Sequence, residues 1–192
     1  MGNRGCIHDD NRTLGVTRWR SRLWICCVLE FRGWRRDVMP PGRWTALFFL
    51  DEATALAAGH RPCGFCRTAD HRWFGESWRA ARGLTARPSA AQMDAWLHAE
   101  RVDGRTRRQL TREVVLGDLP DGAMVRYAGS PALCTGGALL PWSFDGYGEP
   151  LRPAPATRVD LLTPPSIVAA LDAGYLPLVH SSAGPTPMRA FR

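Results

Sequence analysis

The sequence of 192 residues contains no lysine, so all 25 of its basic side chains are arginine. It also has no long apolar segment: the longest apolar run, residues 23–29, is far shorter than the roughly 18 residues that a membrane-spanning helix needs. Residues 1–10 lack the apolar core of a secretory signal peptide. These absences predict a cytoplasmic protein that does not enter a membrane, and we expect a bacterial one. Nothing in the sequence indicates an oligomeric state.

The arginines are distributed unevenly along the chain. Residues 1–112 carry 20 arginines and 11 acidic residues, whereas residues 113–192 carry 5 arginines and 7 acidic residues. Seven of the eight tryptophans also lie in the first segment. The formal net charge is thus +9 in the first segment and −2 in the second, which favours a polyanionic partner for the first. The simpler alternative is that a GC-rich genome replaced lysine by arginine, and that the arginines form an ordinary solvated face.

Apolar patterns and turn residues predict an α+β fold. Residues 1–16 are polar and are expected to form an irregular arm, followed by strands at 24–31 and 45–50. A short helix capped by Asp51 should then end before Gly59. A longer helix is expected at 69–82.

A third helix should begin after Ser89, because Gln92 completes a capping box there. Beyond residue 113 short apolar segments alternate with glycine-rich turns, which is typical of a β-sheet. One more short helix should start at 163–165 and end at Gly174. The strands predicted in this half are 113–116, 123–127, 133–134, 138–140 and 159–163.

Two of the six cysteines form a Cys-x-x-Cys motif, Cys63 and Cys66. In a cytoplasmic protein such a pair is reduced, and its spacing suits two ligands of a tetrahedral zinc ion. Arg61 and Arg67 flank the pair and would offset the charge of the thiolates. Two alternatives stay open: a thioredoxin-like redox pair ahead of a helix, and two buried cysteines without a metal.

Residues 45–67 read Thr-Ala-Leu-Phe-Phe-Leu-Asp-Glu-Ala-Thr-Ala-Leu-Ala-Ala-Gly-His-Arg-Pro-Cys-Gly-Phe-Cys-Arg. This segment resembles the second half of the metal-binding domain of Ada-type DNA-repair proteins, where a strand with paired aromatics and an Ala-rich helix precede Gly-aromatic-Arg-Pro-Cys-x-x-Cys. The resemblance extends upstream to about residue 18 and does not cover residues 85–192. It implies a zinc ion held by four cysteines, contact with the DNA backbone and, in Ada itself, methyl transfer from a phosphotriester to one of these cysteines.

The upstream ligands depart from that family's pattern. The family has Cys-x-x-x-Cys, whereas Cys26 and Cys27 are adjacent here, with Glu30 and Phe31 four residues further on. Neighbours on a strand point to opposite faces, so only one cysteine reaches the metal easily, and we favour Cys27. Because the family's pair is missing, we infer the metal and a DNA contact and not the repair reaction. The candidates for the fourth ligand are His60, His71, His8, Cys6, Glu30 and Cys26.

Arginines alternate with tryptophans in the N-terminal part of the chain. A guanidinium group binds phosphate oxygens in pairs, and an indole ring stacks on an unpaired base. We therefore predict a Zn²⁺ protein that binds nucleic acid. The expected contact residues are Arg18, Arg20, Arg35, Arg36, Arg43, Trp44, Arg61 and Arg67. The predicted organisation is an Ada-like zinc-binding module at 1–83, a connecting helical segment at 84–112 and a small β-rich half at 113–192.

A zinc-dependent enzyme is the alternative function, either a nuclease-like hydrolase or an alkyl acceptor at a zinc thiolate. No catalytic motif supports it: His98 and Glu100 stand two apart on a predicted helix, and no Gly-x-Ser-x-Gly elbow surrounds Ser181. Only a cluster of His98, Glu100 and His180 beside the metal would identify catalytic residues. A third candidate function is a protein-interaction module in which the C-terminal half binds the partner.

Overall fold

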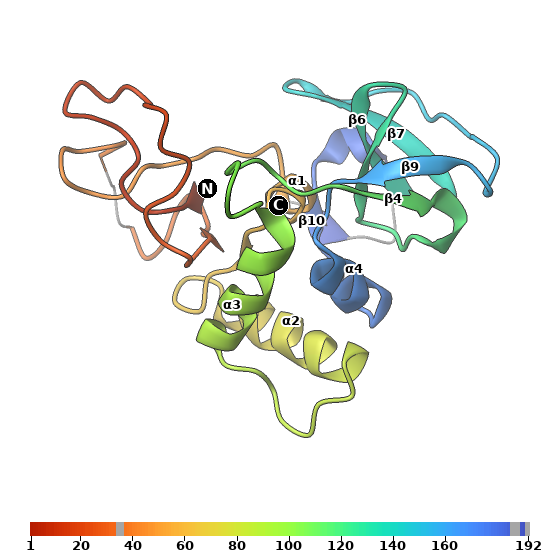
Figure 1. Cartoon of the computed structure of the whole chain (residues 1–192), viewed down its shortest axis with the longest axis horizontal. Coiled ribbons are helices and arrows are strands. Elements are labelled where there is room, and N and C mark those ends of the chain that lie inside the picture. Colours follow the sequence, from red (N-terminus) through yellow and green to blue (C-terminus); the bar gives the residue numbers. More distant parts are fainter. Residues whose placement is uncertain (34–36, 185–188, 191–192) are drawn as a thin grey trace.

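The computed structural model describes residues 1–33, 37–184 and 189–190 and has an α+β fold (Figure 1). The helices are α1 (Glu52–Ala57), α2 (Thr68–Ala81), α3 (Ala90–Arg101) and α4 (Pro165–Asp172). The strands are β1 (Gly2–Asn3), β2 (Ile25–Cys26), β3 (Arg61–Pro62), β4 (Arg112–Val115), β5 (Met124–Tyr127), β6 (Ser130–Thr135), β7 (Ala138–Ser143), β8 (Gly146–Tyr147), β9 (Arg158–Leu161), β10 (Leu178–Val179) and β11 (Arg189–Ala190). Within the described residues, no helix is both long and apolar enough to cross a membrane.

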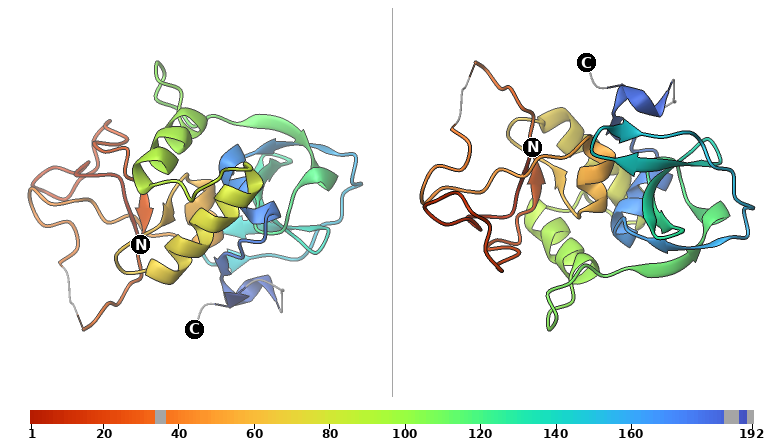
Figure 2. Two further views of the ribbon diagram at one scale, coloured as in Figure 1. Left: turned by 90° about the horizontal axis from the view of Figure 1, so that it is seen from below. Right: turned by 90° about the horizontal axis from the view of Figure 1, so that it is seen from above.

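A six-stranded sheet forms the C-terminal half of the molecule. Its order is β4-β9-β5-β6-β7-β8, and each strand is antiparallel to its neighbours. The sheet lies at one end of the molecule, the N-terminal loops lie at the other, and helices occupy the space between them (Figure 2). The β-rich half predicted from the glycine-rich turns is thus confirmed, with strand bounds that differ by a few residues.

The main hydrophobic core joins this sheet to the helices. It includes Leu56 of α1, Trp78 of α2 and Leu97 of α3, which pack with Val125 of β5 and Ile167 of α4. Apolar contacts therefore continue across residues 83 and 113, the positions at which the sequence analysis divides the chain. The three-segment division stays a prediction.

The N-terminal region has less regular structure than its sequence predicts. A small sheet has the order β1-β2-β3, so the supposed arm contributes a strand, while the strand predicted at 24–31 is reduced to Ile25–Cys26. The strand predicted at 45–50 is reduced to a single bridge between Leu47 and Gly2. Gly5, at φ +91°, is not in extended backbone, although its carbonyl still accepts a hydrogen bond from the N–H of Thr45 at 3.0 Å.

The predicted helix boundaries are confirmed by their caps. The Asp51 carboxylate accepts a hydrogen bond from the backbone N–H of Thr54 at 2.9 Å, and Ser89 and Gln92 form the complete capping box. Gly59 follows α1 at φ +81°, the left-handed conformation that a helix stop of this kind requires.

Gly59 also packs closely against Arg101. Its replacement by alanine should therefore cost stability in two ways, through backbone strain and through a steric clash. A Cβ at position 59 would lie 2.5 Å from Cδ of Arg101, whereas Gly83, at φ +61°, has open space around it. We expect Gly59→Ala to lower the free energy of unfolding by about 2–4 kcal/mol, from backbone strain plus overpacking. Gly83→Ala should cost about 1 kcal/mol, from strain alone. Equal losses in urea unfolding would contradict the close approach of Gly59 to Arg101.

Two buried acidic residues at the start of α1 connect the N-terminal region to the C-terminal half. Asp51 accepts hydrogen bonds from the Tyr147 hydroxyl at 2.8 Å and from the backbone N–H of His180 at 3.1 Å. Glu52 accepts from the Tyr175 hydroxyl at 2.6 Å and from the N–H of Leu178 at 2.9 Å. Since buried carboxylates need such partners, these bonds fix α1 against the C-terminal half.

Candidate metal centre

Three cysteines meet at the edge of the small N-terminal sheet. The sulfur atoms of Cys27, Cys63 and Cys66 all lie within 4.8 Å of one another, and Cys63 is buried while the other two are half-buried. In the part of the chain that the structure describes, this is the only group of three or more His, Cys, Asp or Glu side chains that could hold a metal ion.

The strand register brings the first two cysteines together. Strands β2 and β3 run parallel, with Ile25 opposite Arg61 and Cys26 opposite Pro62, so Cys27 and Cys63 come next along the two strands. The backbone N–H of Cys63 donates to the carbonyl of Cys26 at 3.0 Å. A sequence separation of 36 positions is thus closed by one pair of short strands.

A tight turn then returns the third cysteine to the same place. The N–H of Phe65 points at the sulfur of Cys63 at 3.4 Å, and the N–H of Arg67 donates to the carbonyl of Cys63 at 3.0 Å. Helix α2 begins at Thr68, directly after the turn. His71 of α2 packs over Gly64, where a Cβ would lie 3.3 Å from the imidazole ring. The turn therefore has little room for a larger residue.

The thiol groups of the cluster are electrostatically unequal. A hydrogen bond from the Cys27 thiol, together with the N–H groups of Cys66 and Phe65, lowers the pKa of Cys63 to about 4 despite its burial. The same hydrogen bond to Cys63, aided by burial, raises the pKa of Cys27. Burial raises the pKa of Cys66. Of the three sulfurs, Cys63 is thus the one whose surroundings favour the thiolate, and a metal ion would favour that form at all three.

Two of the predicted ligands lie outside the cluster, which corrects the expectation for Cys26 and His60. Cys26 is buried on the opposite face of the strand, beside Arg67, and burial raises its pKa. His60 is fully buried against Phe49 and Trp24, at 4.8 and 5.5 Å between ring centroids. Burial, and then the charges of Arg4 and Arg101, lower the pKa of His60 well below its usual value. It is a neutral ring in an aromatic environment and does not reach the metal site.

The other candidates for a fourth ligand do not belong to the cluster either. Nδ1 of His8 lies 2.6 Å from the Thr45 hydroxyl, and Nδ1 of His71 lies 3.2 Å from the carbonyl of Pro62. The Cys6 thiol is directed at a backbone carbonyl, that of His8. None of these groups, nor Glu30, joins the cluster. Among the described residues the site therefore offers three protein ligands.

The cluster lines a cavity of about 770 Å³. Its lining is mainly apolar and includes the exposed side chains of Phe48 and Phe65. The sequence does not predict these lining residues, because they come from loops that only the fold brings together. Exposed large apolar side chains mark such a site, but solvent exposure is a property of the fold and is not visible in the sequence. The remaining apolar lining includes Leu29, Val38, Met39 and Pro40.

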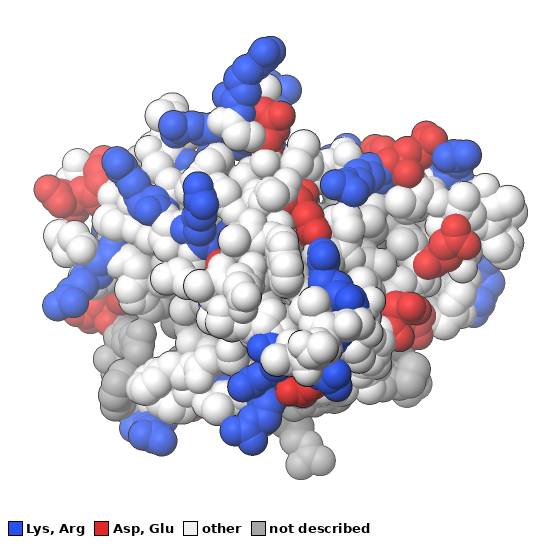
Figure 3. Space-filling model, turned by 60° about the horizontal axis from the view of Figure 1, so that its bottom comes forward, with Lys and Arg blue, Asp and Glu red and all other residues white. Residues whose placement is uncertain are grey.

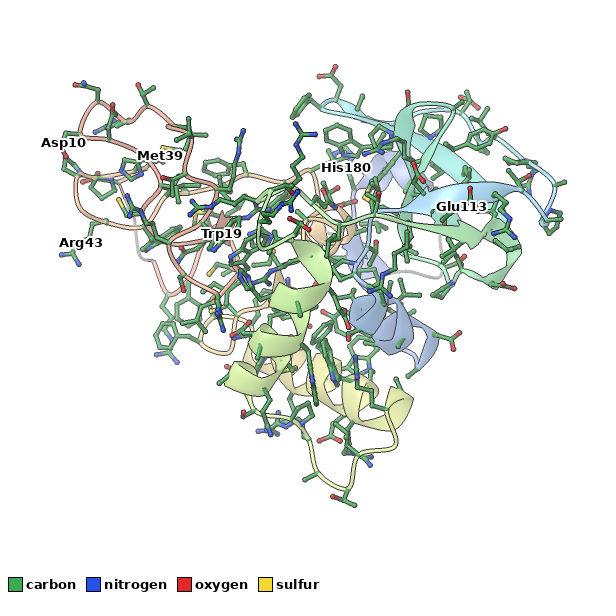
Figure 4. All side chains as sticks on the ribbon, viewed as in Figure 1. Asp10, Trp19, Met39, Arg43, Glu113 and His180 are labelled. Carbon is green, nitrogen blue, oxygen red and sulfur yellow. The ribbon has the colours of Figure 1, made fainter. Side chains whose placement is uncertain are left out.

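The predicted nucleic-acid contacts fall into three groups. Arg18, Arg20 and Arg43 are exposed, and Arg43 projects from the outer edge of the N-terminal loops (Figure 4). Trp44 is half-buried and lines the large cavity. Arg35 and Arg36 lie outside the described residues.

Arg61 and Arg67 are corrections to that prediction, because both are buried in ion pairs. Arg61 binds both oxygens of Asp94 on α3, at 2.9 and 2.7 Å, and both side chains are 3% exposed. Arg67 binds Glu52 at 2.7 Å and Asp70 at 2.8 Å. These guanidinium groups hold the turn of the metal site to the helices and have no access to a phosphate backbone.

Arginines and acidic residues are interspersed on the face shown in Figure 3, and acidic residues are more frequent towards the C-terminal half. The histidines considered for catalysis do not gather. His98 lies against the Trp19 ring at 5.4 Å, Glu100 binds Ser166, and His180 contacts Ser182 beside the sheet (Figure 4). The structure thus brings together no cluster of His98, Glu100 and His180.

Comparisons with protein-family models, with curated protein sequences and with solved structures return no match to this chain.

Proposed function

We propose that Cys27, Cys63 and Cys66 bind a zinc ion and that the module built around it binds nucleic acid. The observation that carries the first part is the mutual approach of the three sulfurs, within 4.8 Å. In a tetrahedral zinc site with Zn–S bonds of about 2.3 Å, sulfurs lie about 3.8 Å apart, so only a small contraction is needed. Soft thiolate donors in tetrahedral geometry favour Zn²⁺ over harder divalent cations.

The zinc ion would have a structural role in this proposal. It would connect β2, β3 and the turn before α2, in a region whose own strands are two residues long. Such short strands supply few backbone hydrogen bonds, so a metal would add stability where the sheet provides little. The resemblance of residues 45–67 to the Ada-type metal-binding domain supports the same reading.

Nucleic-acid binding is supported by the exposed arginines of the N-terminal region. Arg18, Arg20 and Arg43 are exposed, and none of them forms an ion pair with another described residue. Guanidinium groups without a carboxylate partner are free to bind phosphate oxygens. The excess of arginine over acidic residues in residues 1–112 supplies the long-range attraction.

Binding to a short DNA duplex at several salt concentrations tests this function. We expect log K to fall linearly with log salt, and Arg20→Ala and Arg43→Ala each to reduce the slope by roughly 1. Arg152→Ala is the matched control, since Arg152 is exposed but lies in the C-terminal half. Salt-independent binding, or an equal loss in all three variants, would rule out the proposed surface.

An alkyl acceptor at the zinc thiolates is the second candidate, and the large cavity favours it. Catalytic zinc sites keep three protein ligands and an open position, and here three sulfurs line a mainly apolar cavity. An apolar alkyl group would suit that lining better than a charged one. A structural zinc leaves its thiolates unchanged, whereas an acceptor converts one of them into a thioether.

A further inference from the structure

A smaller cavity beside Trp24 is lined by arginines and by none of the three cysteines of the cluster. Its volume is about 220 Å³, and it is bounded by the N-terminal arm, the end of α1 and the segment that follows α3. This volume is below the roughly 300–1,000 Å³ of pockets that hold drug-sized ligands, so it suits a small group. The lining residues are Arg4, Arg18, Trp19, Trp24, Ala58, Arg101, Val102, Arg107, Arg108 and Gln109.

Two of these arginines stack on one indole ring inside the cavity wall. The guanidinium carbons of Arg4 and Arg101 lie 3.9 and 3.8 Å from the centroid of the Trp24 ring. Arg101 donates to the carbonyls of Gly59 and Arg22, both at 2.7 Å, and Arg4 donates to that of Ala58 at 3.1 Å. Backbone carbonyls and the π face of Trp24 thus hold two cations in place.

No carboxylate neutralises these cations within the described part of the chain. None of the five lining arginines takes part in an ion pair there, and both oxygens of Asp94, the acid whose charge reaches Arg101, already bind Arg61. Arg101 is only 2% exposed, yet its Nε has no hydrogen-bond partner among the described residues. A buried guanidinium N–H without a partner is costly, so the charge of Arg101 is incompletely compensated by these residues.

The pKa values of the two stacked arginines agree with an excess of positive charge. Burial, followed by the charge of Arg18, lowers the pKa of Arg4 to about 10. Burial lowers the pKa of Arg101 to about 9, with Asp94 opposing and Arg4 and Arg61 adding to the decrease. The site therefore holds like charges that a bound anion would stabilise.

The rim of the cavity carries further arginines on a hydrogen-bonded turn. Asp103 organises this turn by accepting the N–H groups of Thr106 at 2.6 Å and Arg105 at 3.0 Å. Arg107, held at φ +58°, and Arg108 both line the cavity, and the Arg107 guanidinium lies 5.8 Å from the Trp19 ring. Arg105 belongs to the same turn but does not line the cavity.

We propose that this arginine cavity is a binding site for a phosphate group, with Arg101 at its base and Arg107 and Arg108 at its rim. Guanidinium groups bind phosphate oxygens in pairs, and several of them converge here on a space of suitable size. The phosphate is either a small phosphate ligand or one phosphodiester of a nucleic acid. The proposal goes beyond the function above, because it requires neither zinc nor Arg20 and Arg43.

Calorimetric titration of the whole protein, in a buffer free of phosphate and sulfate, tests the site in two arms: one uses inorganic phosphate and the other a short DNA duplex. We expect Arg107→Ala and Arg108→Ala each to weaken binding at least roughly tenfold, because each removes a charged hydrogen-bond donor. Arg105→Ala, the matched control on the same turn, should change binding less than about twofold.

The outcomes separate the two sources of phosphate and separate this site from the proposed function. Binding of inorganic phosphate that the rim variants weaken supports a small ligand, and the same loss with DNA alone supports a phosphodiester. If neither ligand distinguishes Arg107→Ala and Arg108→Ala from Arg105→Ala, the phosphate site is wrong. Loss of DNA binding in Arg43→Ala, with the rim variants unaffected, would overturn this site and leave the DNA-binding surface in place.

Discussion

Protein with serine at position 27 will contain no zinc, whereas protein with serine at the adjacent position 26 will keep one zinc ion per chain. The reason is the alternation of side chains along β2, since Cys27 lies with Cys63 and Cys66 while Cys26 lies on the other face. Removing one of three thiolates leaves two protein ligands, too few for a stable site. Elemental analysis of protein purified under reducing conditions measures the difference.

Two further variants and a chelator test whether the cysteines form a metal site or a redox pair. Cys63→Ser should also lose zinc, and Cys134→Ser, whose sulfur is buried in the C-terminal sheet, should retain it. Because zinc binding is coupled to folding, the parent protein should unfold at lower urea concentration after treatment with a chelator. Parent protein without zinc, or zinc loss in Cys26→Ser equal to that in Cys27→Ser, would contradict the three-cysteine site.

Replacing Glu52 by glutamine will destabilise the protein by about 3 kcal/mol or more, the usual cost of breaking a buried ion pair. All the groups that bind the Glu52 carboxylate are donors: the Arg67 guanidinium at 2.7 Å, the Tyr175 hydroxyl at 2.6 Å and the N–H of Leu178 at 2.9 Å. A glutamine amide offers one acceptor oxygen and turns a donor towards the remaining groups. The Glu52 carboxylate also raises the pKa of Tyr175, after the larger effect of burial.

Thermal or urea unfolding measures this loss, which corresponds to a fall of roughly 6–12 °C in Tm for a chain of this size. Glu76→Gln is the matched control, because Glu76 forms an exposed ion pair with Arg79 at 2.9 Å. That pair should contribute no more than about 1 kcal/mol. Comparable losses in the two variants would show that the Glu52 carboxylate does not connect α1 to the C-terminal half as described.

Local sequence signals predicted the helices well. Asp51, Ser89 with Gln92, and Gly59 act within a few residues of the backbone groups they cap, so their effect needs no tertiary information. The turn-rich pattern after residue 113 predicted β5 to β8 for the same reason, since these strands pair in sequence order. The pairing of β9 with β4 and β5 is long-range, and the local pattern did not predict it. Strand lengths before residue 50 were wrong because pairing partners, and not β-propensity, limit a strand.

The sequence predicted the three cysteines of the candidate metal site but did not exclude the other candidate ligands. The Cys-x-x-Cys spacing and strand alternation predicted that Cys63, Cys66 and Cys27 would share a site, and the cluster agrees. His60 could not be excluded in this way, since only the fold places it against Phe49 and Trp24.

Arginine positions illustrate what only the tertiary structure decided. The sequence predicted Arg61 and Arg67 as nucleic-acid contacts together with the exposed arginines upstream. In the structure, Asp94 binds Arg61 and Glu52 binds Arg67 in the interior. Arg4 and Arg101 are 97 positions apart, yet both guanidinium groups stack on the Trp24 ring. Helix caps, turns and the Cys-x-x-Cys spacing involve residues close together in sequence, so the sequence alone predicts them. Which charges are buried, paired or left facing one another depends on long-range packing, and only the folded chain sets it.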